Sequence, residues 1–549
     1  MSNSQSLDLH TLSSLIKVFP DTQPAEDTYQ ASVLQGETFS FQVAYYAYEP
    51  LRDVHVDFGA GRGLSVDGRR VGLVASELAV YPGHDDWVLR ANPGLFPDPL
   101  YPVGDDSSLV IPAHQWRALW VTVRIQPDCE PERHSVTVRF RTASGTPLGS
   151  AEFWLDVLPV QMPTPALLHT EWFYTDCLAT WHRVRGFSKS HWRWIDRYLQ
   201  NAVDHGVNTI LTPLFTPPLD TMPGGERPTM QLVGVGRKDG QYSFNFTQLD
   251  RWVDLCQRRG ITHFEWAHLF TQWGARYAPK IVVREGGVER VHFGWRTPAA
   301  EDPYSDFLKA FLPALARYTR RSGLQGRTLF HVADEPSGQD LAAYRLASSM
   351  VRGQTGGAPI LDALSDFRFY QQGLVDVPVV ATDHVDPFLQ ASVANLWVYY
   401  CCSQDQAVSN RFFAMPSVRT RLLGLQLFKY QIKGFLHWGY NHWYGYRSRH
   451  PIDPFLTTDV ECAYPSGDAF VVYPSDAGPI DSLRWEVFYQ GLQDLAVFDL
   501  YRERVGPEAA LSLLEQGLPS PLTFRTGPVA DAWLLGRREA VNRALAAPG

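Results

Sequence analysis

From residue 167 onward, short apolar stretches alternate with amphipathic ones, and this alternation constrains the fold more than any other feature. Eight stretches have the length and composition of buried strands: 167–174, 207–214, 263–270, 327–336, 359–366, 377–383, 394–402 and 434–443. Helical patterns separate most of them, at 191–206, 249–260, 307–323, 337–353 and 418–434. Strands that alternate with helices form parallel sheets, so the pattern predicts a (β/α)8 barrel over residues 166–505. The helices between the fifth, sixth and seventh strands are weakly marked.

The N-terminal part follows a different pattern, in which apolar and polar residues alternate between Gly, Pro and Asp turns. The clearest stretches are 28–47, 118–125, 134–143 and 149–160. Because no convincing helix separates them, we expect a β-sandwich over residues 1–160. The Pro-rich segment 159–165 is expected to link it to the barrel, and residues 506–549 are expected to form a helical C-terminal segment.

Composition narrows the class of protein. The formal net charge of −9 supplies no basic field for phosphate backbones, which argues against a nucleic-acid partner. No stretch approaches the length of a membrane span, and the first twenty residues lack the basic and apolar regions of a secretion signal. The six cysteines show no CxxC spacing and are interpreted as reduced thiols. We therefore expect a cytoplasmic protein without membrane association; the sequence does not indicate an oligomeric state.

Two adjacent carboxylates, Asp334 and Glu335, follow the fourth expected strand. In a (β/α)8 barrel, catalytic residues lie at the carboxyl ends of the strands and in the loops that follow them. Ser337 and Asp340 form a pattern like a capping box, which places the carboxylates beside a helix N-terminus. Successive strand residues face opposite sides, so both side chains enter one cavity only if the chain turns, and Pro336 favours a turn. A capping carboxylate with a solvated neighbour explains the motif equally well on position alone.

A second candidate group lies at and beyond the end of the last strand, in GFLHWGYNHWYGY, residues 434–446. Barrel interiors are usually filled by branched side chains, whereas this stretch is rich in aromatic and polar ones. Trp and Tyr near Asn suit a pocket that stacks on a sugar ring and binds its hydroxyl groups. Aromatic packing beneath the C-terminal segment accounts for about half of them as readily. The candidates for substrate binding here are Trp438, Tyr440, Asn441 and Trp443.

Other strand ends supply further candidates. Glu171 and Tyr174 follow the first strand, His268 the third and Tyr399 the seventh, and all four are expected to contact substrate. Asp383, His384 and His268 could in principle hold a metal, but no HExxH or other ligand spacing is present. The chain also lacks a GxSxG elbow, a P-loop and a GxGxxG after a strand. We expect neither a metal nor a cofactor.

Three of these stretches together resemble a known family. They are the strand that ends in DEP, the stretch GFLHWGYNHW, and PSGDAFVVYPSDAGPIDSLRWEVFYQGLQDLAVF at 465–498. Over roughly residues 165–505 the chain is similar to the family named domain of unknown function 4091. That family is related to glycoside hydrolase family 123, whose known activity is exo-β-N-acetylgalactosaminidase. Ser475 departs from the family pattern, where Gly commonly follows the YP element.

The resemblance implies a substrate and a mechanism. The substrate would be a glycan or glycoside with a terminal β-linked N-acetylhexosamine, most readily N-acetylgalactosamine. Glu335 would be the general acid and later the general base, and Asp334 would orient the 2-acetamido group whose carbonyl oxygen attacks the anomeric carbon. This retaining, substrate-assisted route differs from the ordinary scheme of two opposed carboxylates.

Two alternatives stay open. One is a glycoside hydrolase of other specificity, in which Asp334 or Glu335 acts with a distant carboxylate such as Glu171 or Asp383. The other is a carbohydrate-binding protein without catalysis. A last group is expected to shape the cleft rim or brace the last helix: Asp453, Asp459, Asp468, Arg484 and Glu486.

Overall fold

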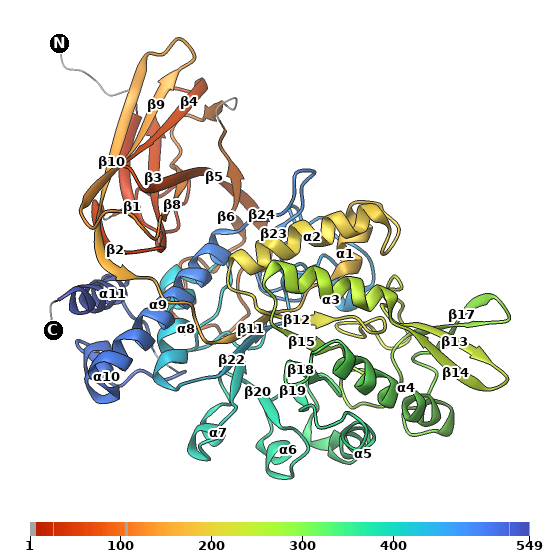
Figure 1. Ribbon diagram of the computed structural model, residues 1–549. Coiled ribbons are helices and arrows are strands. Elements are labelled where there is room, and N and C mark those ends of the chain that lie inside the picture. Colours follow the sequence, from red (N-terminus) through yellow and green to blue (C-terminus); the bar gives the residue numbers. More distant parts are fainter. Residues whose placement is uncertain (1–6, 26, 105–107, 526, 548–549) are drawn as a thin grey trace, which may run out of the picture.

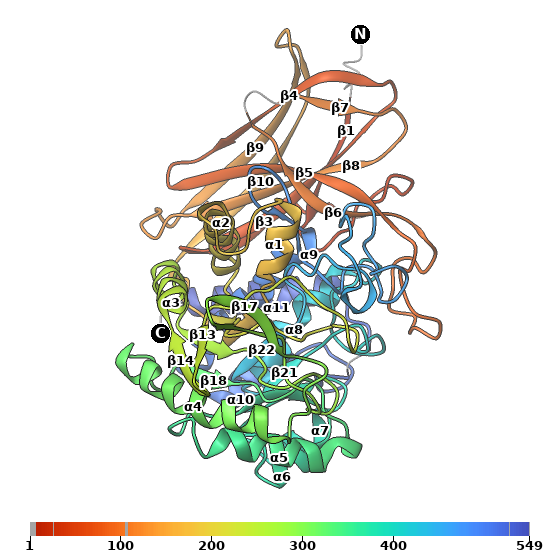
Figure 2. The same ribbon diagram turned by 90° about the vertical axis from the view of Figure 1, so that its right-hand side faces the viewer.

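The computed structural model describes residues 7–25, 27–104, 108–525 and 527–547. The first six residues of the expected sandwich and the last two of the expected C-terminal segment lie outside them. Figures 1 and 2 show two sheets at one end of the molecule and a barrel with its helices at the other.

The N-terminal part consists of two five-stranded sheets. The first has the order β1 (Leu7–Ser13), β3 (Thr38–Ala47), β8 (Arg117–Ile125), β5 (Leu64–Ser76) and β6 (Gly94–Pro102). The second has the order β2 (Gln30–Gln35), β10 (Pro147–Gln161), β9 (Arg133–Thr142), β4 (Leu51–Ala60) and β7 (Leu109–Ile111). Alternate residues of both sheets meet in one apolar cluster that includes Phe41 and Val121 from the first sheet and Val138 and Phe153 from the second. The alternation seen in the sequence is therefore the alternation of faces.

Eight parallel strands form the second part, and they are nearly closed into a barrel. In spatial order they are β11 (Leu168–Glu171), β12 (Thr209–Thr212), β15 (His263–Trp266), β18 (Thr328–Phe330), β19 (Leu361–Leu364), β20 (Val377–Ala381), β21 (Trp397–Tyr399) and β22 (Gly434–His437). β22 pairs with β11, and a single bridge between Phe330 and Ile360 joins β18 to β19. Each strand falls inside one of the eight expected stretches.

Helices surround the barrel, and their lengths differ between its two halves. The first half carries α1 (Thr175–Trp181), α2 (Lys189–Asp204), α3 (Thr247–Arg259) and α4 (Asp302–Arg321). The second carries α5 (Leu341–Arg352), α6 (Phe367–Gln371), α7 (Asp386–Gln390) and α8 (Ser417–Lys429). The helices that the sequence marked weakly, α6 and α7, have only five residues each.

Two small sheets lie outside the barrel and were not anticipated from the sequence. One is four-stranded, with the order β14 (Gln241–Asn245), β13 (Gly234–Lys238), β16 (Ile281–Glu285) and β17 (Val288–Phe293). Its strands come from the segment after β12, interpreted from the sequence as a Gly/Pro-rich loop, and from the segment after β15, where no strand was expected. The other pairs β23 (Val472–Tyr473) with β24 (Ile480–Asp481).

The C-terminal helices connect the two parts. α9 (Leu483–Val505) packs on α8, and α10 (Pro507–Glu515) follows it. α11 (Asp531–Ala546) returns to the N-terminal sheets, where the Glu539 carboxylate accepts hydrogen bonds from the backbone and hydroxyl of Ser32 at 3.0 and 2.6 Å. Arg538 joins Glu37 of the sheets to Asp494 of α9, at 2.8 and 2.9 Å. The described part of the expected C-terminal segment thus contains two helices joined by a non-helical stretch, and α11 bridges sheets and barrel.

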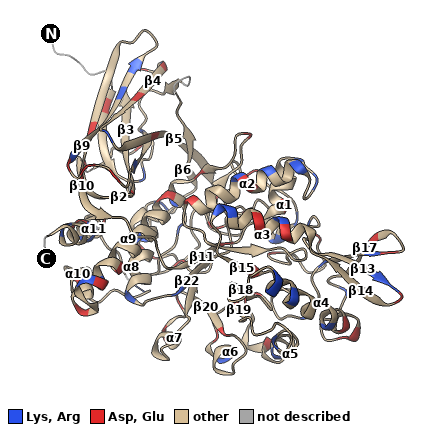
Figure 3. Cartoon of the chain, in the orientation of Figure 1, with Lys and Arg blue, Asp and Glu red and all other residues tan. Residues whose placement is uncertain are grey.

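Within the described residues, no helix combines the length and the apolar character needed to cross a bilayer. Figure 3 shows basic and acidic residues interspersed along the helices in this view, without one dominant sign.

Candidate active site

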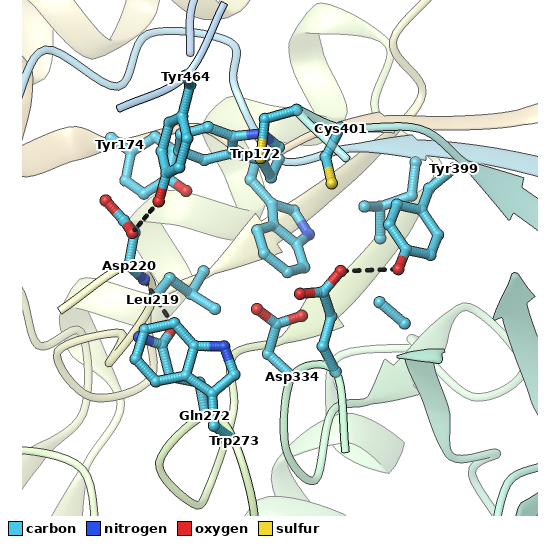
Figure 4. A pocket seen from close by; sticks show the side chains of 15 residues that line it. Trp172, Tyr174, Leu219, Asp220, Gln272, Trp273, Asp334, Tyr399, Cys401 and Tyr464 are labelled. Atoms are coloured by element: carbon cyan, nitrogen blue, oxygen red, sulfur yellow. Dashed lines mark hydrogen bonds between the residues drawn. The ribbon is translucent and has the colours of Figure 1, made fainter. Parts of the chain in front are cut away.

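A cavity opens at the carboxyl ends of the barrel strands, where side chains from five strand ends and three later loops meet (Figure 4). Three of its lining residues are carboxylates, Asp220, Asp334 and Glu335, and its described lining contains no Lys or Arg. The remaining lining residues are Trp172, Tyr174, Leu219, Gln272, Trp273, Ala363, Tyr399, Cys401, Cys402, Leu436, Trp438 and Tyr464. A cavity with six aromatic side chains and a few convergent polar groups fits a sugar ring.

A turn after β18 brings both members of the acidic pair into this cavity. Glu335 has a φ of +42°, in the left-handed region that side chains with a Cβ seldom adopt, and Pro336 follows it. Asp340 fixes the backbone that follows Pro336, because its carboxylate accepts hydrogen bonds from the backbone N–H and the hydroxyl of Ser337 at 3.1 and 2.6 Å. The left-handed backbone conformation of Glu335 costs about 1–3 kcal/mol and persists only where the surrounding structure fixes it.

The environment of the pair favours a bound proton. Loss of hydration raises the pKa of Asp334 well above its ordinary value, and the neighbouring charge of Glu335 raises it further. Loss of hydration also raises the pKa of Glu335, against the lowering effect of a hydrogen bond. The Tyr399 hydroxyl donates that bond to Glu335 Oε1 at 2.7 Å. Two adjacent acids with raised pKa values suit proton transfer near neutral pH.

A buried polar network fixes the strand end just before Asp334. His331 contacts Glu265 through Nε2 at 2.7 Å and Asp362 through Nδ1 at 3.1 Å. Burial alone would lower the pKa of His331, but these hydrogen bonds raise it to about 9, so the imidazole is charged at neutral pH. The Asp362 carboxylate also accepts hydrogen bonds from the backbone of Val332 and Ala333, at 3.1 and 3.4 Å. The network therefore anchors the backbone on which Asp334 stands.

Three tryptophans line the cavity, and a hydrogen bond fixes the position of each. Trp172 donates from Nε1 to Glu265 at 3.2 Å, and Trp438 donates to Asp468 at 2.9 Å. The Trp273 backbone N–H donates to the carbonyl of Asp334 at 3.1 Å, which ties the loop after β15 to the acidic pair. The flat faces of these rings are the kind of surface on which the apolar side of a sugar rests.

Three of the eight residues expected to bind substrate line the cavity: Tyr174, Tyr399 and Trp438. The other five are buried elsewhere and contact protein. Glu171 accepts two hydrogen bonds from Arg411 at 2.8 and 2.9 Å, and His268 stacks on His331. Tyr440 donates to the carbonyl of Tyr198, Asn441 bonds the backbone of Tyr174, and Trp443 donates to the carbonyl of Val472.

Asp220 and Tyr464 are among the polar lining residues that sequence reasoning missed. Asp220 lies in the loop after β12, and Tyr464 in the loop between β22 and β23. Neither position follows a strand end closely, and no local spacing marks them. For Tyr464 a signal existed, because it immediately precedes the family-like stretch that begins at Pro465.

The metal set considered from the sequence is not assembled, because Asp383 and His384 contact each other at 2.8 Å while His268 lies beside His331. A different group, His268, His331 and Asp362, has potential ligand atoms within 4.8 Å of one another. Both nitrogens of His331 are already engaged with carboxylates, so this arrangement fits a hydrogen-bonded ion network better than a metal site.

Comparison with known proteins identifies a family and solved structures of similar fold. Residues 172–501 match the family model described as glycoside hydrolase 123, catalytic domain. A family 123 glycoside hydrolase from Clostridium perfringens, studied for glycolipid glycan hydrolysis, is similar with a TM-score of 0.75 and 14% identity, over 98% of both chains. No curated protein matches the chain.

Two further solved structures match more weakly. A family 2 β-galacturonidase from Eisenbergiella tayi reaches a TM-score of 0.32 at 12% identity, over 83% of this chain and 70% of its own. A family 5 mannosidase from Rhizomucor miehei reaches 0.34 at 13% identity, over 62% and 94%. Scores this low carry no argument about fold or function.

Proposed function

Because the chain belongs to glycoside hydrolase family 123, we propose that it is a retaining exo-glycosidase that removes a terminal β-linked N-acetylhexosamine, most readily N-acetylgalactosamine. Membership of the family and the fold shared with the Clostridium perfringens enzyme make the chain a glycoside hydrolase. The choice of an acetamido sugar and of the retaining route rests on the acidic pair.

In the proposed first step, Glu335 donates its proton to the glycosidic oxygen while the bond from that oxygen to the anomeric carbon breaks. The carbonyl oxygen of the substrate's own 2-acetamido group forms the new bond to that carbon, and a cyclic oxazolinium ion results. The alcohol leaves. Glu335, now a carboxylate, removes a proton from water as the water oxygen attacks the anomeric carbon and opens the ring. Two displacements at one carbon retain its configuration.

Asp334 has a separate role in this scheme. The acetamide N–H donates to its carboxylate, which orients the carbonyl for attack and stabilises the positive charge that develops on nitrogen. A hydrogen bond to the charged form lowers the pKa of an acid. Substrate binding therefore favours ionised Asp334 and leaves the shared proton on Glu335, which is the distribution that the first step needs.

The observation that carries the proposal is the placement of two adjacent carboxylates in one cavity wall. Ordinary retaining enzymes place their two carboxyl groups about 5 Å apart across the scissile bond. Neighbouring residues reach instead two groups on adjoining carbons, the aglycone oxygen at C1 and the acetamide at C2. Of the distant carboxylates considered from the sequence, Glu171 is bound by Arg411 and Asp383 contacts His384 and Gln404.

Hydrolysis of three 4-nitrophenyl β-glycosides tests the proposal, with N-acetylgalactosamine, N-acetylglucosamine and galactose as the sugars. We expect turnover of the acetamido sugars and a rate on the galactoside at least about 100-fold lower, because galactose lacks the internal nucleophile. An acetamido-sugar thiazoline, which mimics the oxazolinium ion, should inhibit. Equal rates on galactoside and acetamido sugars would overturn assistance by the acetamide, and sugar binding without turnover of any of them would indicate a binding protein.

A further inference from the structure

The loop between β5 and β6, residues 77–93, belongs to the N-terminal part but packs against the barrel beside the cavity. Figure 1 shows β6 beside β24, where the two parts meet. The loop contacts two barrel loops, residues 400–416 after β21 and residues 456–468 after β22. Three of the residues that line the cavity come from these two barrel loops: Cys401, Cys402 and Tyr464.

The barrel loop 456–468 has a strained backbone just before Tyr464. Val460, Glu461 and Cys462 have φ values of +54°, +61° and +60°. Side chains with a Cβ seldom adopt this region, and three such residues in succession persist only where the surrounding structure fixes them. The place of Tyr464 in the cavity wall therefore depends on the groups that hold this turn.

Asp459 holds the strained turn and joins it to the N-terminal part. Its Oδ1 accepts a hydrogen bond from the backbone N–H of Cys462 at 3.0 Å, and its carbonyl accepts one from the N–H of Tyr464 at 3.0 Å. Its Oδ2 accepts hydrogen bonds from the backbone N–H groups of Glu77 and Leu78, at 3.1 and 2.8 Å. One oxygen of this buried carboxylate thus fixes the turn, and the other is fixed by the loop of the N-terminal part.

Further hydrogen bonds join the same two loops on either side of Tyr464. The Tyr81 hydroxyl donates to the carbonyl of Ala463 at 2.9 Å. The backbone N–H of Ser466 donates to the carbonyl of Leu78 at 2.9 Å. The chain is therefore held by the N-terminal part both immediately before Tyr464 and two residues after it.

The other barrel loop, 400–416, is held by the same N-terminal segment. The Asp85 carboxylate accepts hydrogen bonds from both terminal nitrogens of the buried Arg419 guanidinium, at 2.9 and 2.8 Å. It also accepts one from the backbone N–H of Ala407 at 2.5 Å. The Tyr81 hydroxyl interacts with the thiol of Cys402, near the start of this loop. Tyr81 thus contacts both barrel loops that line the cavity.

We propose that the N-terminal part completes the active site, and that Asp459 is the positioning residue through which loop 77–93 holds Tyr464 in the cavity wall. Tyr81 has the same role to a smaller degree. The inference rests on the proposed function only in that it takes this cavity as the active site. The N-terminal sheets act on the reaction through the geometry of the cavity, and not as a separate sugar-binding module.

A double-mutant cycle tests whether Asp459 acts through Tyr464. The variants are Asp459→Asn, Tyr464→Ala and the two combined, and kcat/KM is measured on 4-nitrophenyl N-acetyl-β-galactosaminide. The amide keeps the shape of Asp459 but turns an NH₂ group toward backbone N–H donors. We expect each single variant to lose about 10–100-fold, because the cavity wall is displaced. The double variant should lose no more than about 3-fold beyond the weaker single variant, because both changes act by the same route.

Asp156→Asn is the matched control. It breaks a contact between the N-terminal sheets and Arg543 of α11, which does not involve the cavity loops. Its kcat/KM should stay within about 2-fold of wild type.

Hydrogen exchange supplies a readout that does not depend on turnover. The N–H groups of Cys462 and Tyr464 are bonded to Asp459, so peptides that cover residues 460–466 should exchange about 10-fold faster in Asp459→Asn. They should exchange as in the wild type in Asp156→Asn. Tyr81→Phe removes one hydroxyl and should give a smaller change of the same sign in both measurements. It replaces Asp459→Asn in the cycle if that variant does not fold.

Three outcomes would overturn the inference: wild-type rates in Asp459→Asn, losses that multiply in the double variant, or unchanged exchange over residues 460–466. The proposed function fails separately, on the aryl glycoside assay of the wild type. If the wild type does not hydrolyse the acetamido glycosides, the exchange experiment still decides whether the N-terminal part holds Tyr464 through Asp459.

Discussion

Glu171 and Glu335 are two glutamates at the same end of one barrel, yet their surroundings are opposite. Glu171 ends β11, is fully buried and accepts two hydrogen bonds from the Arg411 guanidinium. Glu335 lies beyond β18 in the cavity, where its observed partner is the hydroxyl of Tyr399. A bidentate guanidinium fixes the position of a carboxylate, whereas an acid with a raised pKa and no cation beside it can exchange a proton. The comparison separates carboxylates that hold the fold from those available for chemistry.

The sharpest test of this contrast is Glu335→Gln. The amide keeps the shape of the side chain but cannot donate the proton that a leaving alcohol needs. We expect kcat/KM on glycosides with poor leaving groups to fall about 10²–10⁴-fold, and less for 4-nitrophenyl glycosides. Steady-state kinetics on both substrate types measures this, with Glu503→Gln on the exposed side of α9 as control. A uniform loss on both types would contradict the role of general acid.

The corresponding test for Glu171 is the substitution of its partner, Arg411→Met. Removal of the guanidinium leaves Glu171 buried without its cation, and breaking a buried ion pair in this way costs about 3–5 kcal/mol. Denaturant unfolding at pH 7 should show the loss in the free energy of unfolding. The double variant Glu171→Gln with Arg411→Met should recover part of it. If Arg411→Met unfolds like the wild type, the pair is not a structural element.

Replacing a carboxylate by its amide should change the stability at pH 7 in opposite directions for the cavity acid Asp334 and for the ion-paired Glu171. The folded-state pKa of Asp334 lies above its ordinary value of 3.8. Below that value the acid is protonated in both states; as the pH rises toward the folded pKa, the unfolded chain releases its proton first and folding stability is lost. Asp334→Asn escapes this loss, so we expect a melting temperature about 1–3 °C above wild type at pH 7 and no difference near pH 3.5. Glu171→Gln should be less stable than wild type at pH 7.

The smallest expected effect is that of Tyr399→Phe. Its hydroxyl lowers the pKa of Glu335, so the variant should raise that pKa. The basic limb of the profile of kcat/KM against pH should move to higher pH by less than about one unit, with a loss of activity of about 10-fold or less. Unchanged melting temperature would confirm that the fold is intact. A shift of the limb to lower pH would contradict the hydrogen bond.

The barrel strands could be predicted from the sequence because strand and helix patterns are local. All eight expected stretches contain a barrel strand, and the weak marking of α6 and α7 reflects their short length. The strands β13 and β16 were not predicted, since their pairing with each other depends on contacts between distant parts of the chain. The domain limits at 160, 166 and 505 remain predictions.

Residue roles were harder to predict because they depend on partners far away in sequence. Asp334 and Glu335 could be singled out by adjacency and position, and the structure places both in the cavity wall. Glu171 also lies at a strand end, but its partner Arg411 lies 240 residues further on. The stretch 434–446 is rich in aromatic residues, yet Trp438 lines the cavity while Tyr440 and Trp443 are buried in the core. Local sequence does not distinguish these cases.

The placement of α11 has a consequence for how the protein is made. Its residues bond to Ser32 and Glu37, which leave the ribosome well before α11 does because they precede it in the chain. During translation the sheet surface that carries Ser32 and Glu37 therefore stays uncovered until some five hundred further residues have been added. A nascent chain halted before α11 should therefore be more open to proteases and chaperones at β2 than the released protein.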